Sequence, residues 1–450
     1  MGRLFGTDGA RGIANTEISC ELAMKTARAT AMVLSEYKNK SKLKILIGTD
    51  TRKSADMLMS AMAAGFCSVG CDVITLGVVP TPAVAFLTKK YSFDAGVMIS
   101  ASHNSCEYNG IKIFYSDGYK LSDETEEKTE AIILDDIMPP PLKIGGEVGS
   151  ISENKNAVND YIKHIAETAE FNFSDMKICC DCANGSASVT AKALFRSLGA
   201  DCTVINSSPD GVNINENCGS THIDVLCEYV RNNGFDIGFS FDGDADRLLC
   251  SDNEGNAVDG DKILAICAKA LKEQGRLKED TAVCTVMSNM GLFSFLGKNG
   301  IRCEKTKVGD RYVLEKMLEK GYNLGGEQSG HIIFLDHATT GDGQLTAVQV
   351  LNILKKTGKS LKELTSEIEI FPQVLKNVRV SHFGKLRLFE DNDIKIAIEN
   401  AQRVLGENGR VLVRPSGTEP LVRIMTEGKN KEITQSLAEQ LSQVIKERLI

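Results

Sequence analysis

Short apolar runs alternate with amphipathic stretches along most of the chain. The runs Lys44–Gly48 and Ala95–Ile99 are bounded by polar residues and are too short for helices, so they predict buried strands. Around them, Leu22–Leu34 and Met57–Val69 carry apolar residues at three- and four-residue spacing, which predicts helices. Strands that alternate with helices in this way predict an α/β fold with doubly wound layers.

The alternation continues to the end of the chain and predicts several domains. A length of 450 residues, at about 150 residues per domain, gives three or four. We expect four, with bounds 1–150, 151–253, 254–369 and 370–450, the first ending in a linker that contains Pro139–Pro141. The other predicted helices are 158–169, 186–198, 262–272, 311–320, 345–354, 394–405 and 433–449, and the other predicted strands are 71–76, 111–114, 176–181, 201–205, 235–241, 282–286, 332–334, 377–380, 411–413 and 422–425.

Turn signals punctuate the first domain. Pro80-Thr81-Pro82 predicts a turn, and Asn109-Gly110 predicts a hairpin that leads into a strand presenting Lys112. The glycine-rich stretch Phe5–Gly12 predicts a tight loop that carries Arg11.

The most informative stretch is Ser100–Asn104, which directly follows the strand predicted at 95–99. Open α/β sheets place their chemistry at the carboxyl ends of strands. This loop offers a hydroxyl, Ser102, beside an imidazole, His103, and Asp50 and Arg52 stand just past the end of the strand at 44–48.

The second domain ends in a strand followed by Asp242, Asp244 and Asp246. Three carboxylates this close repel, so a cation must compensate them, and oxygen ligands suit Mg²⁺, Ca²⁺ or Mn²⁺. A calcium EF-hand is excluded because its sixth and twelfth positions, glycine and glutamate, are Arg247 and Asn253 here. The spacing predicts a Mg²⁺-type site with room for a phosphate oxygen.

A polar loop interrupts the third domain at Gly325–His331. Glycines frame Glu327, Ser329 and His331, and alternate polar side chains beside small residues suit the hydroxyls of a sugar.

The fourth domain contains a candidate anion site. Two arginines and two hydroxyls surround a glycine turn, which favours an oxyanion. The residues are Arg414, Ser416, Gly417, Thr418 and Arg423. The chain has no G-x-x-x-x-G-K-[ST] P-loop, and its G-x-G at Gly341 and Gly343 lacks the third glycine of a dinucleotide fingerprint.

Composition narrows the class of protein. A net charge of −8 argues against nucleic acid or a membrane surface as partner. No apolar stretch approaches the ~20 residues of a membrane span, and the first residues lack the apolar run of a signal peptide. We therefore expect a cytoplasmic protein whose fourteen cysteines are thiols.

Together these loops indicate phosphoryl chemistry on a sugar. A serine hydroxyl is a weak nucleophile at neutral pH, whereas a phosphoserine beside a metal ion is a phosphoryl donor. A second anion site away from the metal implies that the substrate already carries a phosphate. An enzyme with both features can move a phosphate around a sugar.

These stretches, in order, resemble the α-D-phosphohexomutase family across the whole chain. The sequence motifs at residues 5–12 and 326–331 are most similar to the branch of the family that acts on glucosamine phosphates. The resemblance implies three similar mixed α/β domains and a smaller C-terminal α+β domain around a central cleft. It also implies a homodimeric isomerase that interconverts glucosamine 6-phosphate and glucosamine 1-phosphate through glucosamine 1,6-bisphosphate, on the route to UDP-N-acetylglucosamine.

The resemblance gives each motif a role. Ser102 is the implied phosphoserine, with Mg²⁺ and an activating bisphosphate as cofactors. The implied residues are Ser102, Asp242, Asp244 and Asp246 for the metal; His103, Lys112, Arg11 and Arg247 around the transferring group; Glu327, Ser329 and His331 for the sugar; and Arg414, Ser416, Gly417, Thr418 and Arg423 for the other phosphate. Ser105 replaces the proline that commonly follows His-Asn in the family.

Three alternatives stay open at this point. The chain could be a phosphomannomutase/phosphoglucomutase that acts on other hexose phosphates. A non-catalytic sugar-phosphate sensor is disfavoured because neither the serine nor an aspartate is missing. A metal-dependent phosphatase would need ready access of water to the site.

Overall fold

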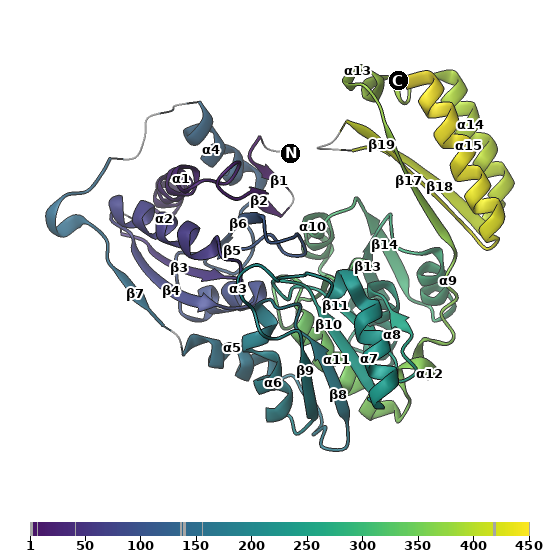
Figure 1. The fold of residues 1–450 in the computed structure, drawn as a ribbon, viewed down its shortest axis with the longest axis horizontal. Helices are drawn as coiled ribbons and strands as arrows, with labels where there is room; N and C mark the ends of the chain where they lie inside the picture. The colour runs from purple at the N-terminus through teal and green to yellow at the C-terminus, as the bar shows by residue number, and fades with distance from the viewer. Residues whose placement is uncertain are drawn as a thin grey trace. The chain divides into compact units, whose positions relative to one another are not determined.

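In the computed structural model, the described residues are 3–6, 8–40, 42–135, 137, 141–154, 156–416 and 420–449. The chain forms two compact units, a larger one of residues 1–288 and 299–367 and a smaller one of residues 289–298 and 368–450. The larger unit contains three of the four sheets and the smaller unit the fourth (Figure 1).

Seven strands form the first sheet: β1 (Phe5–Gly6), β2 (Gly9–Ile13), β3 (Lys44–Thr49), β4 (Asp72–Val78), β5 (Ala95–Ile99), β6 (Tyr108–Tyr115) and β7 (Ile151–Glu153). Their order is β1-β2-β6-β5-β3-β4-β7. β3, β4, β5 and β7 run parallel, whereas β6 pairs antiparallel with β5 and with β2.

Helices cover both faces of this sheet, as the doubly wound prediction requires. They are α1 (Cys20–Lys38), α2 (Ala55–Ser68), α3 (Thr81–Lys90) and α4 (Asp123–Leu134). Successive residues of a strand face opposite sides. Ile45 and Ile47 join the buried cluster of α1 and α2, whereas a side chain at Gly48 would meet Val84 of α3. Figure 1 shows α1 and α2 together on one side of the sheet.

The second and third sheets repeat this mixed design. The second has the order β12-β11-β10-β8-β9 and the third the order β14-β13-β15-β16. The strands are β8 (Lys177–Asp181), β9 (Asp201–Ile205), β10 (Ile237–Phe241), β11 (Leu248–Ser251), β12 (Ala257–Val258), β13 (Thr281–Thr285), β14 (Arg302–Thr306), β15 (Leu324–Gly326) and β16 (Ile332–Phe334). The helices are α5 (Ala157–Ala166), α6 (Ala191–Ser197), α7 (Ile223–Asn233), α8 (Gly260–Glu273), α10 (Asp310–Lys320), α11 (Gly343–Thr357) and α12 (Leu361–Thr365).

The smaller unit is an antiparallel sheet covered by helices. Its strands follow the order β17-β19-β18, and α14 and α15 pack together against it (Figure 1). The elements are α9 (Met290–Lys298), β17 (Gln373–Arg379), α13 (His382–Arg387), α14 (Asn392–Leu405), β18 (Gly409–Pro415), β19 (Leu421–Gly428) and α15 (Lys431–Leu449). Three mixed α/β sheets followed by a smaller α+β unit confirm the predicted fold class. No helix among the described residues is long and apolar enough to cross a membrane.

The hairpin predicted at Asn109-Gly110 is wrong, because both residues lie inside β6. A side chain at Gly110 would come within 2.6 Å of the Ser100 carbonyl oxygen and 2.8 Å of that of Ala10. The glycine therefore serves close packing of backbone rather than a turn. The Asn109 side chain donates to Ser54 Oγ at 2.8 Å.

The turn predicted at Pro80-Thr81-Pro82 is also wrong, because Thr81 and Pro82 open α3. Proline fits the first turn of a helix, where the N–H that it lacks would have no helical partner. Pro139 and Pro140 of the predicted linker lie outside the described residues.

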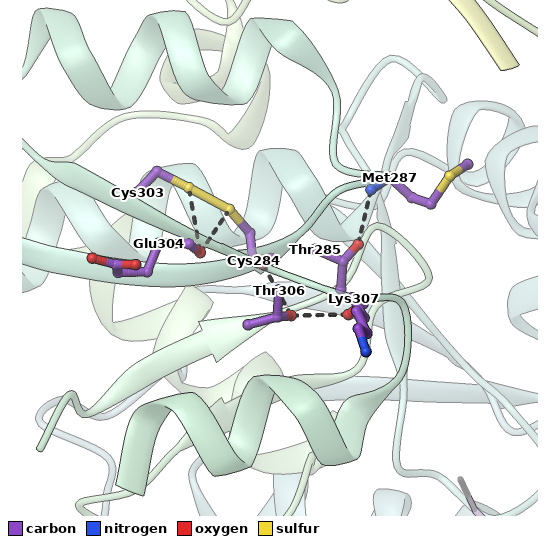
Figure 2. Close-up of a disulfide and its surroundings, with 7 residues drawn as sticks. All are labelled: Cys284, Thr285, Met287, Cys303, Glu304, Thr306 and Lys307. Carbon is purple, nitrogen blue, oxygen red and sulfur yellow. Dashed lines mark hydrogen bonds between the residues drawn. A yellow bond between two sulfur atoms is a disulfide. The ribbon is translucent and has the colours of Figure 1, made fainter. Parts of the chain in front are cut away.

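The prediction that every cysteine is a thiol is wrong at one pair. Twelve cysteines are free, but Cys284 of β13 and Cys303 of β14 form a disulfide (Figure 2). Cys303 lies opposite Ala282, two residues before Cys284 on the same face of the sheet. The parallel register therefore brings the two sulfurs together. The thiol prediction, which rested only on the expected cellular compartment, could not take this register into account.

Glu130 of α4 holds the N-terminal segment against the first sheet. Its buried carboxylate accepts hydrogen bonds from the backbone N–H groups of Arg3 (2.8 Å), Leu4 (2.7 Å) and Phe5 (2.6 Å). Because Phe5 begins β1, and β1 pairs with β2, this carboxylate helps to fix the strand that carries Arg11.

We expect Glu130→Gln to loosen this segment. An amide offers one acceptor oxygen and turns an N–H toward an N–H, and a buried unsatisfied donor costs about 1–3 kcal/mol. Hydrogen exchange of the Leu4 and Phe5 amides should therefore accelerate roughly tenfold or more, measured by mass spectrometry of the N-terminal peptide. Glu127→Gln, an exposed position on the same helix, should leave exchange unchanged. Unchanged exchange in Glu130→Gln would contradict the anchor.

Candidate active site

A buried ion pair supports the loop that follows β5. Arg52 and Asp50 are both fully buried, with Arg52 Nε 2.9 Å from Asp50 Oδ2. The Arg52 guanidinium also donates to the backbone oxygens of Ser102 (3.0 Å) and Asn104 (2.8 Å). One cation thus satisfies a carboxylate and two loop carbonyls, which fixes the backbone of the loop.

Ser102 occupies a strained position in this loop. Its φ is 53°, a conformation that non-glycine residues rarely adopt. The Ser102 N–H donates to Ser100 Oγ at 2.9 Å, and Ser100 Oγ donates to Asp50 Oδ2 at 2.6 Å. Asp50, acting through Ser100, therefore stabilises the unusual backbone conformation of Ser102. This conformation directs the Ser102 hydroxyl away from the strand that precedes it.

That hydroxyl meets the aspartate loop. Ser102 Oγ donates to Asp242 Oδ2 at 2.5 Å. One oxygen from each of Asp242, Asp244 and Asp246 lies within 4.8 Å of the others, and all three residues are buried. Within the described part of the chain, Asp244 Oδ1 and Asp246 Oδ1 are buried without a hydrogen bond. Orphaned carboxylate oxygens beside a hydroxyl are what a hard cation would satisfy.

The three aspartates strain one another electrostatically. Burial, and then the charges of Asp246 and Asp244, raise the pKa of Asp242 well above its usual range. For Asp246, burial also favours the neutral form, but Lys112 and then His331 outweigh it and lower the pKa. The loop therefore needs positive charge, and part of that charge comes from the protein itself.

Lys112 of β6 supplies it. This lysine is fully buried, with Nζ 2.8 Å from Asp244 Oδ2, 3.4 Å from Asp246 Oδ2 and 2.9 Å from Asp8 Oδ2. Burial alone would lower the pKa of Lys112, but Asp244 and Asp8 raise it well above its ordinary value. Lys112 is therefore a fixed cation of this carboxylate cluster.

His103 stays neutral beside Ser102. Burial first, and then the charges of Arg247 and Arg11, lower the pKa of His103 to about 4. Its Nδ1 lies 3.1 Å from Arg247 Nη1 and 3.4 Å from Ser102 Oγ. Because the guanidinium can only donate, Nδ1 accepts from it.

The two arginines approach Ser102 from different elements: Arg11 lies in β2, so the tight loop predicted to carry it is wrong, and Arg247 lies in the loop between β10 and β11. Arg11 donates to Asn104 Oδ1 at 3.2 Å and pairs with Asp8 at 2.5 Å. The backbone N–H of Arg247 donates to Asp242 Oδ1 at 3.2 Å. Burial lowers the pKa of Arg247, but the carboxylates of Asp242 and Asp246 more than offset that effect. The Arg247 guanidinium therefore stays charged near the serine.

The polar loop of the third sheet reaches the same cluster of side chains. Glu327 and His331 flank the turn between β15 and β16. Glu327 Oε1 accepts from the Gly309 N–H at 3.0 Å. His331 Nδ1 lies 3.6 Å from Asp246 Oδ2, and Nε2 accepts from the Gly341 N–H at 3.1 Å. His331 thus joins this loop to the aspartates.

The smaller unit holds two opposed arginines. Arg414 on β18 and Arg423 on β19 are direct partners across the sheet. Burial, and then the charge of Arg423, lower the pKa of Arg414. Ser416 is buried, and its N–H donates to the Leu421 carbonyl at 2.9 Å. Two facing guanidinium groups favour an anion between them, while Gly417 and Thr418 lie outside the described residues.

The larger unit therefore brings together most of the residues predicted from the sequence. The residues it gathers around the aspartate loop are Ser102, His103, Lys112, Arg11, Arg247, Asp242, Asp244, Asp246 and His331. Glu327 contacts the start of α10, and Ser329 is exposed in the same turn.

Sequence reasoning missed three charged residues. Lys120 Nζ lies 2.5 Å from Asp8 Oδ1 and 2.5 Å from Asp310 Oδ2, and Asp310 Oδ2 lies 3.8 Å from His331 Nε2. Asp8 stands in the glycine-rich stretch that predicted a role for Arg11, so a signal was present there. Lys120 and Asp310 lie in stretches of polar sequence without a recognisable motif. They meet only because the segment after β6 packs beside the start of α10.

Family models match nearly the whole chain. They are described as phosphoglucomutase/phosphomannomutase, alpha/beta/alpha domain I (residues 2–138), domain II (159–255) and domain III (259–371), and the C-terminal domain (375–444).

Full-length relatives and solved structures agree with these matches. Proteins named phosphoglucosamine mutase from Acetivibrio thermocellus and Clostridium acetobutylicum are each 53% identical, with all of both chains covered. A phosphoglucomutase/phosphomannomutase family protein from Burkholderia thailandensis has a TM-score of 0.82 at 22% identity, covering 100% of this chain and 99% of that one. N-acetylphosphoglucosamine mutase from Aspergillus fumigatus, solved with GlcNAc-6P and magnesium, has a TM-score of 0.68 at 16% identity, covering 100% and 96%. The chain belongs to the phosphoglucomutase/phosphomannomutase family of phosphohexomutases, in one group with the relatives named phosphoglucosamine mutase.

Proposed function

We propose that this isomerase interconverts glucosamine 6-phosphate and glucosamine 1-phosphate by way of a phosphoserine at Ser102. The observation that carries the proposal is the Ser102 hydroxyl, 2.5 Å from Asp242 in a buried aspartate loop. The substrate follows from the relatives named phosphoglucosamine mutase that match the full chain. No observation favours mannose or glucose phosphates over the amino sugar.

Two phosphoryl transfers complete the reaction. The phosphoryl group leaves Ser102 Oγ and forms a bond to O1 of glucosamine 6-phosphate, whose O1 hydroxyl gives up its proton. The resulting 1,6-bisphosphate turns over in the site. Ser102 Oγ then takes the phosphoryl group from O6, the proton returns to O6, and glucosamine 1-phosphate leaves. Free glucosamine 1,6-bisphosphate would reload a serine that has lost its phosphate.

The cations around Ser102 stabilise the charge that develops during transfer. Arg11, Arg247 and Lys112 fill this role. A role for Lys112 as a general base would require it to lose a proton first, which Asp244 and Asp8 oppose. We therefore assign Lys112 to charge stabilisation, and the neutral His103 to a hydrogen bond with Arg247.

The buried aspartate triad fits one Mg²⁺. Its three carboxylates form an all-oxygen donor set in which two oxygens, Asp244 Oδ1 and Asp246 Oδ1, have no hydrogen bond. Mg²⁺ usually takes a few carboxylates together with phosphate oxygens. When bound, the ion would neutralise charge on the phosphoryl group. Asp242, Asp244 and Asp246 would hold it, with the phosphate of Ser102 as a further ligand.

The remaining loops bind the rest of the substrate. Glu327 and Ser329 would take sugar hydroxyls beside His331, and Arg414, Ser416, Gly417, Thr418 and Arg423 would grip the phosphate that is not transferred. The four domain boundaries, the homodimer and the cytoplasmic location stay predictions from the sequence.

Ser102→Ala should abolish both the mutase activity and the covalent phosphate. The variant lacks the oxygen that carries the phosphoryl group, so intact mass should show no phosphate increment and glucosamine 6-phosphate should not be converted. Ser105→Ala, an exposed serine of the same loop, should retain both. Activity in Ser102→Ala would end the covalent mechanism at this serine.

Asp244→Asn should weaken Mg²⁺ binding at least tenfold. The change preserves shape but removes a charge and turns an N–H₂ group toward the cation. Calorimetric titration with Mg²⁺, on protein whose phosphorylation state is fixed by intact mass, measures the effect. Asp236→Asn, just before the other end of β10, is the control. Equal affinities in wild type and Asp244→Asn would place the ion elsewhere.

Arg414→Ala should raise KM for glucosamine 6-phosphate steeply and leave phosphorylation of Ser102 intact. Arg414 would bind the phosphate that is not transferred, whereas the serine receives its phosphoryl group in the larger unit. Steady-state kinetics with intact mass separates the two effects. Arg403→Ala, an exposed arginine on α14, should behave as wild type. Normal kinetics in Arg414→Ala would contradict this assignment.

A further inference from the structure

The sequence does not explain how an amino sugar would be distinguished from other hexose phosphates. Glucosamine differs from glucose at C2, where an amine replaces a hydroxyl. With a pKa of about 8, like an α-amino group, this amine is mostly an ammonium at neutral pH. Recognition of it calls for a carboxylate oxygen that no protein cation already occupies.

Most carboxylate oxygens around the aspartate loop already have a partner or belong to the proposed metal site. Asp8 gives one oxygen to Lys120 and the other to Lys112 and Arg11. Asp242, Asp244 and Asp246 form the proposed metal site. Two carboxylates outside these groups remain, Asp310 and Glu327.

Each of these two carboxylates uses only one oxygen. Asp310 Oδ2 lies 2.5 Å from Lys120 Nζ, and Glu327 Oε1 accepts from the Gly309 N–H at 3.0 Å. Asp310 Oδ1 and Glu327 Oε2 have no hydrogen-bond partner among the residues that the structure describes. Asp310 is partly accessible, with 13% of its side chain exposed.

The two carboxylates are neighbours in space as well as in chemistry. Glu327 holds the N–H of Gly309, the residue directly before Asp310. Burial, and then the charge of Asp310, raise the pKa of Glu327, against the opposite effects of His331 and Arg247. A cation beside Asp310 would relieve this repulsion.

The position of Asp310 is well fixed. Lys120 is 9% exposed and lies 2.5 Å from both Asp310 and Asp8, so Lys120 ties Asp310 to the carboxylate that also contacts Lys112. Asp310 begins α10 and follows Gly309, whose φ of 129° requires a glycine. A preorganised carboxylate loses little entropy when it binds a ligand.

We infer that Asp310 binds the C2 ammonium of the substrate and so selects amino sugar phosphates, while Glu327 takes a neighbouring hydroxyl. This inference rests on the proposed mutase reaction and adds its specificity-determining residue. A site built around a charged partner disfavours an analogue that lacks the charge, because the carboxylate is then left uncompensated. Glucose 6-phosphate should therefore be the poorer substrate.

The decisive measurement is the ratio of kcat/KM for glucosamine 6-phosphate to that for glucose 6-phosphate, with product quantified by mass spectrometry. Asp310→Asn should lower this ratio at least tenfold, mainly through the amino sugar. Lys120→Met breaks the same ion pair but keeps the carboxylate free for the ammonium, so it should not lower the ratio even where it lowers both values. A parallel loss in Asp310→Asn would overturn the inference and leave Asp310 a positioning residue.

The pH dependence of the same ratio provides a test in the wild-type enzyme. Protein groups that titrate affect both substrates, whereas only glucosamine 6-phosphate loses a charge. The groups that face Asp310 are Lys120, His331, Glu327 and Glu126. The ratio should fall as the pH rises through about 8 in wild type and stay flat in Asp310→Asn. A flat wild-type ratio would overturn the inference.

The outcomes also separate this inference from the proposed function. Wild-type enzyme that converts neither sugar phosphate would overturn both. Wild-type enzyme that converts glucosamine 6-phosphate while Asp310→Asn keeps the full preference would overturn the role of Asp310 alone.

Discussion

Lys112 and the carboxylates around it depend on one another. A lysine this deeply buried keeps its charge only because Asp8, Asp244 and Asp246 surround it. Equally, three aspartates on one loop can stay close in a buried place only with positive charge beside them. Removing one partner of a buried pair leaves a charge without compensation, at a cost of roughly 3–5 kcal/mol. This cluster holds the aspartate loop beside the serine loop, which the Arg52–Asp50 pair fixes separately.

The cluster closes into a ring that crosses three parts of the larger unit. Asp8 links Lys112 to Lys120, Lys120 reaches Asp310, and Asp310 faces His331, which returns to Asp246. These side chains come from the neighbourhoods of the first, second and third sheets. Apolar packing brings sheets together with some freedom in position, whereas short ion pairs between buried groups tolerate little displacement. The short pairs of this ring, at Asp8, Lys112, Lys120 and Asp310, therefore help to fix the relative placement of the loops, whereas His331 contacts Asp246 and Asp310 at longer range.

Features formed by residues close together in the sequence could be predicted, whereas contacts between distant parts of the chain could not. The triad at 242–246 and the serine at 102 could be predicted because each lies in a short motif that directly follows an apolar strand. Lys120 and Asp310 could not, since they are 190 residues apart and meet only after folding. The asparagine–glycine pair at 109–110 misled for a related reason. Its glycine accommodates the backbone of Ser100 and Ala10, a packing demand that local sequence does not reveal.

The two candidate phosphate sites use opposite electrostatic designs. The aspartate loop gathers negative charge and awaits a cation, which would in turn attract a phosphate. Arg414 and Arg423 gather positive charge across β18 and β19 and attract an anion directly. In the proposed reaction the two phosphates of one bisphosphate must exchange places, so neither site can hold its phosphate too firmly. Repulsion between the two arginines makes their site less stable without a bound anion. Burial of the aspartates likewise makes the metal site less stable without a cation. Part of the energy gained when a phosphate binds is used to offset this repulsion, so the net binding stays weak enough for release after transfer.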